Sequence, residues 1–525
     1  MTTRQILLEL LDSLKKEEKQ TLTIEHEKKK TGVKYVILYE WLEKQIKKGN
    51  KVYDREEFLK GKDKSWTLKR LRAAEDNLYK KILENLSVKY LNKNSITELN
   101  QRIAEAEILK NKGFYDNSFE RLNRAEAIAK KHHKNALLIE IIPKKIDVIL
   151  LTKHEEREKK VRALSEQLLI ATTAVQQEAE YRMLNVNLLV QFQKSRDPKK
   201  IPLFLKDQYH TLINKGVPSS GSFYSQYYFY SIQAIWANLH REGELAYKHQ
   251  KKVVELWQKE EHKGIREENT QSYLTQFANL INYAIVSEDF KRAQEALDSM
   301  AKIKTHSKDE QAEKEQNLLF YQQLIYLNEH EFEEAKELVP AITKLLVPTT
   351  KDISIPNKPL KGNAKRIHEE NRRRVIHYKR VNPSRVYNFH YNTLITLLIC
   401  KDYSEADKWL KRLVNTYKKA DPRKDIQQLE RIFQLTIIYG LRSDEFSKRT
   451  FNKLYNSNSE ETPKVLSPFE QVMHDFFEKM MQGATITENQ TNHLRKLLKD
   501  LEELAEKDKK VLGYQDIVLW IKGHF

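Results

Sequence analysis

The sequence predicts an all-α protein that consists mainly of repeated helical hairpins. Its 525 residues include only 13 Gly and 12 Pro, fewer than strands joined by tight turns require. An apolar pattern also recurs along the chain, with an aromatic residue followed by small or apolar residues three, seven and ten positions later. These offsets place four side chains on one face of a helix.

The four occurrences of this pattern indicate the second helix of each hairpin. Turn-like residues precede every occurrence, and hairpins that recur bury their apolar faces on one another to form a solenoid. The aromatic positions are Tyr115, Phe290, Phe332 and Tyr403, and the small residues that follow are Ser118, Ala293, Ala335 and Ala406. We expect these residues to pack within and between the repeats.

Weaker turn signals near His154, Asp197 and Glu244 extend the series. With them, a repeat unit of about 42 residues is consistent along most of the chain, close to the range of known helical repeats. One gap of 71 residues, from Phe332 to Tyr403, is longer and predicts an insertion.

We expect three parts along the chain. Residues 1–95 carry three apolar stripes and form a small helical N-terminal bundle, which also suits a DNA-binding-like arrangement. Residues 96–455 form the repeat region, with a basic insertion at 347–386. Residues 456–525 form a highly charged C-terminal helical cap, because a terminal repeat needs a polar outer face.

The pattern resembles that of tetratricopeptide repeats. In that family an aromatic residue opens the second helix and a small residue follows three positions later, the roles taken here by Tyr115, Phe290, Phe332 and Tyr403 and by the small residues after them. The repeat is longer than the family's unit of about 34 residues. The resemblance therefore implies a divergent, right-handed α-solenoid with a concave surface that receives a peptide or another protein. The N-terminal bundle followed by such repeats also resembles a broad group of uncharacterised bacterial helical-repeat proteins.

The charge and cysteine content narrow the classes of partner and compartment. A net charge of +19 favours acidic partners such as nucleic acid, an acidic protein surface or anionic lipid. The alternative is a compositional bias toward lysine. One cysteine, Cys400, excludes an intrachain disulfide, and no stretch is apolar enough for a membrane span. We expect a cytoplasmic protein without a membrane span.

An aromatic segment at 223–230 is the first candidate binding region. It holds six aromatic residues in eight positions, and two interpretations stay open: core packing between hairpins, or tyrosines that line a groove and contact a partner. Stacking on nucleobases is a further alternative. The tyrosines proposed for partner binding are Tyr224, Tyr227, Tyr228 and Tyr230.

An arginine-rich segment within the insertion is the second candidate region. Arginine forms bidentate bonds with carboxylate or phosphate, so contacts with an acidic protein or with nucleic acid are both open, as is a solvated charged helix. The residues concerned are Arg366, Arg372, Arg373, Arg374, Lys379 and Arg380.

No motif for catalysis, cofactor binding or metal binding stands out. His132-His133 lacks convergent ligands, and His368-Glu369 lacks the second histidine of a helical zinc site. We therefore expect a non-enzymatic scaffold or adaptor that binds another protein or peptide. The alternative function is a nucleic-acid-binding or regulatory protein that uses the basic N-terminal bundle, particularly Lys64 to Lys81, and the arginine-rich insertion.

Overall fold

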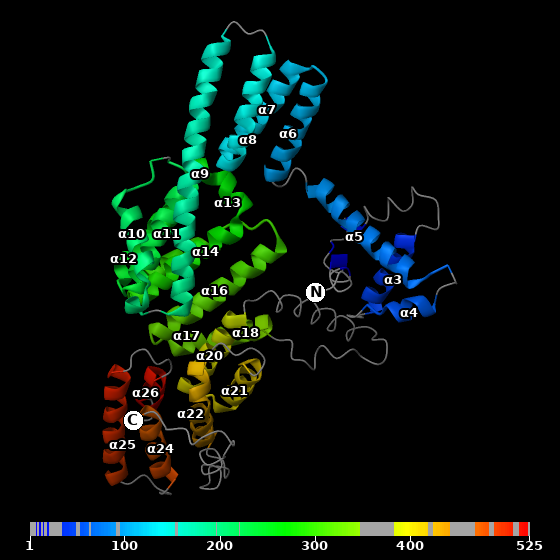
Figure 1. Ribbon diagram of the computed structural model, residues 1–525. Helices are drawn as coiled ribbons and strands as arrows, with labels where there is room; N and C mark the ends of the chain where they lie inside the picture. Colours follow the sequence, from blue (N-terminus) through cyan, green and yellow to red (C-terminus); the bar gives the residue numbers. More distant parts are fainter. Residues whose placement is uncertain are drawn as a thin grey trace. The chain divides into compact units, whose positions relative to one another are not determined.

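The chain is described here from a computed structural model (Figure 1). The description covers residues 7, 10–11, 14, 18–19, 34–48, 53–61, 65–90, 95–152, 156–195, 197–219, 221–346, 383–417, 424–441, 468–481, 488–507 and 514–522. Every regular element in these ranges is a helix, and none of these residues forms a strand. The predicted all-α class is confirmed.

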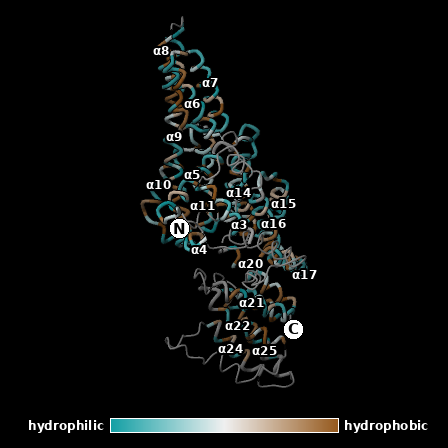
Figure 2. The backbone as a smooth tube through the Cα atoms, turned by 90° about the vertical axis from the view of Figure 1, so that its right-hand side faces the viewer, coloured by the Kyte–Doolittle hydropathy of each residue, from teal (hydrophilic) through white to brown (hydrophobic). Residues whose placement is uncertain are grey.

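The chain divides into two compact units, which are described separately. Unit 1 comprises residues 1–240, 255–269 and 354–360, and unit 2 comprises residues 241–254, 270–353 and 361–525. In both units apolar and polar residues alternate along the helices, as the hydropathy colouring in Figure 2 shows. This alternation lets each helix bury one face and expose the other.

Unit 1 begins with the helices α3 (Lys34–Lys48), α4 (Arg55–Lys60) and α5 (Leu68–Tyr90). Their shared core contains apolar residues from the predicted stripes, including Leu38, Leu42, Leu71, Leu78 and Ile82. Phe58 from α4 is fully buried among them. The Asp54 carboxylate caps α4 by accepting the N–H of Glu56 at 2.8 Å.

The rest of unit 1 contains seven further α-helices among the described residues. Successive helices from α6 to α9 pack against one another, and α9 also packs against α10 and α11. The elements are α6 (Ser95–Asn111), α7 (Tyr115–Lys131), α8 (Asn135–Leu151), α9 (Arg157–Lys194), α10 (Leu203–Asn214), α11 (Phe223–Leu239) and α13 (Lys263–Glu268), with short 3-10 turns at Pro198–Lys200 and Glu260–His262.

Unit 2 contains the remaining helices. It begins at residue 241, just before α12 (Gly243–Gln258), whose last four residues belong to unit 1. The others are α14 (Thr270–Val286), α15 (Phe290–Ala301), α16 (Lys308–Asn328), α17 (Phe332–Glu337), α18 (Val339–Leu346), α20 (Pro383–Ile399), α21 (Tyr403–Tyr417), α22 (Lys424–Leu441), α24 (Pro468–Met481), α25 (Glu488–Lys507) and α26 (Tyr514–Lys522). The hairpins α14/α15, α16/α17 and α20/α21 follow one another, and α16 packs against both α14 and α20.

One turn geometry joins the helices of the recurring hairpins. The helices α7, α15, α17 and α21 each begin at the aromatic residue of the repeated pattern. Two positions before each aromatic, the backbone adopts a left-handed conformation, at Gly113, Glu288, His330 and Lys401. The next residue donates its N–H to a carbonyl five positions earlier, at 2.9 Å from Phe114 to Leu109 and at 3.0 Å from Asp289 to Ala284. This is the Schellman ending of a helix.

The small residue of the pattern lies where the two helices of a hairpin meet. Ala293, Ala335 and Ala406 are completely buried, and each donates its N–H to the carbonyl of the residue before the aromatic. In the first hairpin Ser118 takes this place, and its hydroxyl donates to the Ala106 carbonyl at 2.7 Å. A larger side chain there would separate the helices, because closely packed interiors leave little unfilled space.

The spacing of the repeats differs from the expectation in one region. The turn signals near His154 and Asp197 lie at the two ends of α9, a single helix of 38 residues (Figure 1). The signal near Asp197 therefore ends a helix and does not open the second helix of a hairpin. The signal near Glu244 lies at the first turn of α12, which follows a left-handed residue, Arg241.

Candidate protein-binding surface

The tyrosines proposed for partner binding lie on α11 in unit 1. All four are partly buried, so none is a freely exposed side chain. Tyr224 packs edge-on against Phe223 with ring centroids 5.1 Å apart, and Tyr227 packs edge-on against Tyr228 at 4.9 Å. Burial raises the pKa of Tyr224 to about 12. The structure thus gives these rings packing contacts, and their contact with a partner remains a prediction.

Phe223 is the centre of this aromatic cluster. It is fully buried at the first turn of α11. Its ring meets Trp257 edge-on at a centroid distance of 5.1 Å and His262 at 4.9 Å. Such pairs add roughly 0.5–1.5 kcal/mol beyond the burial of their area. The cluster thereby holds the 255–269 segment against α11 within unit 1.

The second predicted region lies outside the described residues. Arg366, Arg372, Arg373, Arg374, Lys379 and Arg380 all belong to the segment between α18 and α20 for which no structure is described. Their role in binding therefore remains a prediction from the sequence.

A half-buried carboxylate near the aromatic cluster caps a helix far away in the sequence. Glu268, the last residue of α13, accepts the N–H of Ser95 at 2.8 Å and its hydroxyl at 3.0 Å. Ser95 is the first residue of α6, so the carboxylate neutralises the positive end of that helix. Lys134 and His132 lie 3.4 and 3.3 Å away. Burial opposes ionisation, but the Ser95 bonds and these two cationic neighbours lower the pKa of Glu268.

Two histidines form a direct contact beside this carboxylate. His133 Nε2 lies 3.1 Å from His262 Nδ1, so one ring donates and the other accepts. Burial, together with the nearby His262, lowers the pKa of His133 to about 4. Both rings are therefore neutral at ordinary pH. No group of three His, Cys, Asp or Glu side chains in the described part of the chain could hold a metal ion.

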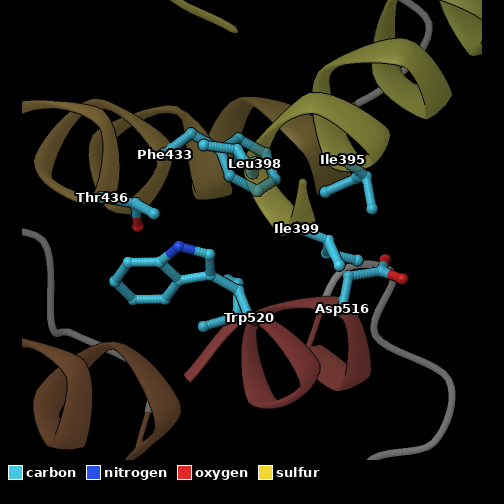
Figure 3. Close-up of a pocket in the computed structure, with 8 residues that line it drawn as sticks. Ile395, Leu398, Ile399, Phe433, Thr436, Asp516 and Trp520 are labelled. Atoms are coloured by element: carbon cyan, nitrogen blue, oxygen red, sulfur yellow. The ribbon is translucent and has the colours of Figure 1, made fainter. Parts of the chain in front are cut away.

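A small enclosed cavity lies in unit 2 between α20, α22 and α26 (Figure 3). Its volume of about 10 Å³ is near the minimum for one water molecule. Leu398, Phe433 and Trp520 line it, and the Asp516 carboxylate at its edge points away from the Trp520 ring (Figure 3). That carboxylate accepts the hydroxyl of Tyr391 at 3.0 Å, and burial raises its pKa. The cavity is too small for a substrate.

The outer face of α9 is the largest exposed apolar feature in the described part of unit 1. Its inner face is buried through Leu164, Ala171, Tyr181, Leu184 and Leu188. The opposite face also carries large apolar residues, each exposed to between 41% and 69%: Leu169, Ile170, Met183, Val186, Leu189 and Val190. We call this set the α9 outer face.

Part of this face forms a short apolar strip. Met183, Val186 and Val190 are spaced three and four residues apart, so they lie on one side of the helix. The exposed Arg182 borders this strip, and polar residues that include Gln176 and Glu180 separate it from Leu169. The following helix α10 adds Leu203, 72% exposed, and Phe204, 57% exposed. The neighbouring Leu205 packs in one core with Tyr181 and Leu188 of α9.

The sequence prediction missed the α9 outer face for a physical reason. Apolar residues on both sides of a helix give no single stripe, so the periodicity that identified the other helices is weak here. The sequence feature that could have revealed this face is that α9 contains more apolar residues than a helix with one buried side needs.

Comparison with known proteins identifies no relative. The described residues define an all-α protein of packed helical hairpins, in which no helix combines the length and apolar character needed to cross a membrane. No family model matches the chain, no curated protein is significantly similar to it, and no solved structure matches its fold at a significant level.

Proposed function

We propose that this protein is a non-enzymatic scaffold or adaptor that binds another protein through its helical repeats, with the α9 outer face as a principal contact. The observation that carries this proposal is the exposure of Met183, at 59%, and Val190, at 56%, on one side of the same helix. Exposed apolar patches of this kind mark interaction sites, because leaving them in water costs free energy that a partner recovers.

A divergent tetratricopeptide-like, right-handed solenoid is the architecture that we propose for this function. The recurring turn, the fully buried small residue and the packing of α16 against both α14 and α20 support it. A cytoplasmic location fits a chain with one cysteine, whose thiol donates to the Phe332 carbonyl at 3.4 Å and whose pKa is raised by burial to about 11.

The chemistry of the strip indicates what kind of partner fits. Its residues are aliphatic side chains and Met183, so most of the contact comes from shape and apolar area, and the exposed Arg182 beside them can pair with an acidic residue of the partner. An amphipathic helix laid along α9 would place apolar side chains at three- and four-residue spacing against the strip. The helix spans 38 residues, about 57 Å, so a partner helix of ordinary length can be accommodated.

The proposal is tested by photo-crosslinking in the native cell. A photoreactive residue at Val186 is expected to give one discrete adduct with another protein, identified by mass. The triple substitution M183E/V186E/V190E, combined with a photoreactive residue at Leu189, is expected to abolish the adduct seen from Leu189 alone. Burying three uncompensated carboxylates costs several kcal/mol, enough to prevent binding.

A matched control separates loss of apolar contact from added charge. Asn117, Asn123 and Ala127 are exposed on α7 in the same unit, and their replacement by Glu adds the same charge without touching α9. This control should retain the adduct. An adduct that survives M183E/V186E/V190E would contradict the proposal. So would an adduct containing only a second copy of this chain, since the face would then serve self-association.

A further inference from the structure

The N-terminal helices of unit 1 present a cationic helix face that the proposed scaffold function does not use. Residues 60–81 contain eight Lys and Arg against three Asp and Glu. Most of this segment forms α5, which follows α4 after residues 61–67. In α5 the apolar residues Leu71, Leu78 and Ile82 face the core. Lys69, Arg72 and Lys80 therefore fall on the opposite side.

The acidic residues of this segment do not neutralise the exposed face. Glu75 is only 2% exposed and forms a bidentate ion pair with Arg55 of α4, so its charge is compensated inside the bundle. Lys69, Arg72 and Lys80 are exposed and form no ion pair within the described residues. Asp76 is the one exposed acid between Leu68 and Lys80 in this helix. The outer side of α5 thus has a net positive charge.

The start of α5 is held in a fixed position. The N–H of Arg70 donates to the Thr67 hydroxyl at 3.3 Å, and its guanidinium donates to the Ser65 carbonyl at 2.8 Å. The ammonium of Lys34 from α3 donates to the same carbonyl at 2.7 Å. Because these bonds fix the start of the helix, α5 loses little backbone entropy when it binds a partner.

We propose that α5 binds duplex DNA, with Lys69, Arg72 and Lys80 contacting backbone phosphates while the exposed Asn77 faces the base edges. An α-helix about 10–12 Å in diameter fits the major groove of B-DNA, which is about 12 Å wide. α5 packs against α3 through its apolar side, which leaves the cationic side exposed for the groove. The deep, narrow major groove of duplex RNA does not admit a helix, so the proposal is specific for DNA.

The experiment measures the affinity of the full chain for a labelled DNA duplex of about 20 base pairs, roughly two helical turns, by fluorescence anisotropy at several salt concentrations. K69Q/R72Q/K80Q is expected to weaken binding by about tenfold or more at low salt and to reduce the salt slope by about 2–3, because three phosphate contacts disappear. D76N removes the opposing charge from the same face and is expected to tighten binding several-fold.

The control is a triple variant with equal charge removed elsewhere. Lys251, Lys291 and Lys304 are exposed in unit 2 and form no ion pair within the described residues. K251Q/K291Q/K304Q should leave DNA affinity within about twofold of the wild type, because these lysines are not among the proposed phosphate contacts. Three outcomes would overturn the proposal: no DNA binding by the wild type at low salt, equal weakening in the control, or equal or tighter binding of an RNA duplex of the same sequence. D76N with unchanged affinity would count against α5 as the contact.

Discussion

The ring of Tyr403 occupies the space that a side chain at Gly440 would need. A Cβ atom placed on Gly440 falls closer than 3.0 Å to three carbons at the hydroxyl end of that ring. Tyr403 opens α21, and Gly440 lies in the last turn of α22. The hydroxyl of Tyr403 also accepts the indole N–H of Trp520 at 3.2 Å. One aromatic residue of the repeated pattern therefore connects α21, α22 and α26.

Gly440→Ala is expected to destabilise unit 2 by about 1–3 kcal/mol, because the methyl group forces the Tyr403 ring or α22 to move. This sign is opposite to that of an ordinary helical glycine, where alanine stabilises by about 1 kcal/mol. Thermal and urea unfolding of the full chain measure the change. Combining G440A with Tyr403→Ala should cost less than the sum of the two single changes, since the residues are in contact. A stabilising effect of G440A would show that the ring is free to shift.

The turn geometry gives a second prediction, at Lys401. This residue has a φ of 59°, in the left-handed region that side chains with a Cβ rarely adopt. Lys401→Gly is expected to raise the unfolding free energy by about 0.5–1 kcal/mol, because glycine adopts this conformation without strain. Urea unfolding checks it. The control is Ser404→Gly in the first turn of α21, where glycine should destabilise by a few tenths of a kcal/mol. Equal effects at the two positions would contradict the strain at Lys401.

Residue types reveal some of these turns in the sequence and conceal others. Gly113 signals a left-handed turn directly, and the aromatic after it fixes the start of α7. Glu288, His330 and Lys401 lie in stretches that the sequence indicated as turns, but their residue types do not show that the backbone there is left-handed. Contacts between residues that are distant in the sequence cannot be predicted from the local residue pattern. Ser95 and Glu268 lie 173 positions apart, and only the folded unit shows that they meet.

The candidate sites likewise combine features that the sequence predicts with contacts that only the structure shows. The sequence predicted that the aromatics at 223–230 belong together, but the packing partners Trp257 and His262 come from a segment that periodicity could not place beside them. The α9 outer face was missed because two apolar sides cancel the helical period. For α5 the sequence indicated a basic segment, and the structure added that Glu75 is buried and paired while Lys69 and Arg72 stay exposed.

The His133–His262 contact predicts that acid weakens unit 1 before most carboxylates titrate. The pKa of His133 is about 4 in the folded protein against an ordinary value of 6.5, so the unfolded chain binds the proton more tightly. The stability that this group contributes is present above pH 6.5 and is lost as the pH falls toward 4. The surrounding groups are His132, Lys134 and Glu261, and burial outweighs the favourable charge of Glu261. His262 has a lowered pKa for the same main reason.

His133→Asn is expected to reduce this acid sensitivity. Asparagine tolerates the left-handed backbone of His133, whose φ is 49°, and its amide can hydrogen-bond without titrating. Melting of the full chain at about pH 7.5 and about pH 5 should show a smaller loss of stability in H133N than in the wild type, by on the order of 1 kcal/mol after solvent screening. The control is His306→Asn, because His306 is exposed and its replacement should leave the acid-induced loss unchanged. If H133N and the wild type lose the same stability between the two pH values, the His133–His262 pair does not control the response to acid. The response must then come from His249 and His390, because burial also lowers the pKa of each of these histidines to about 4.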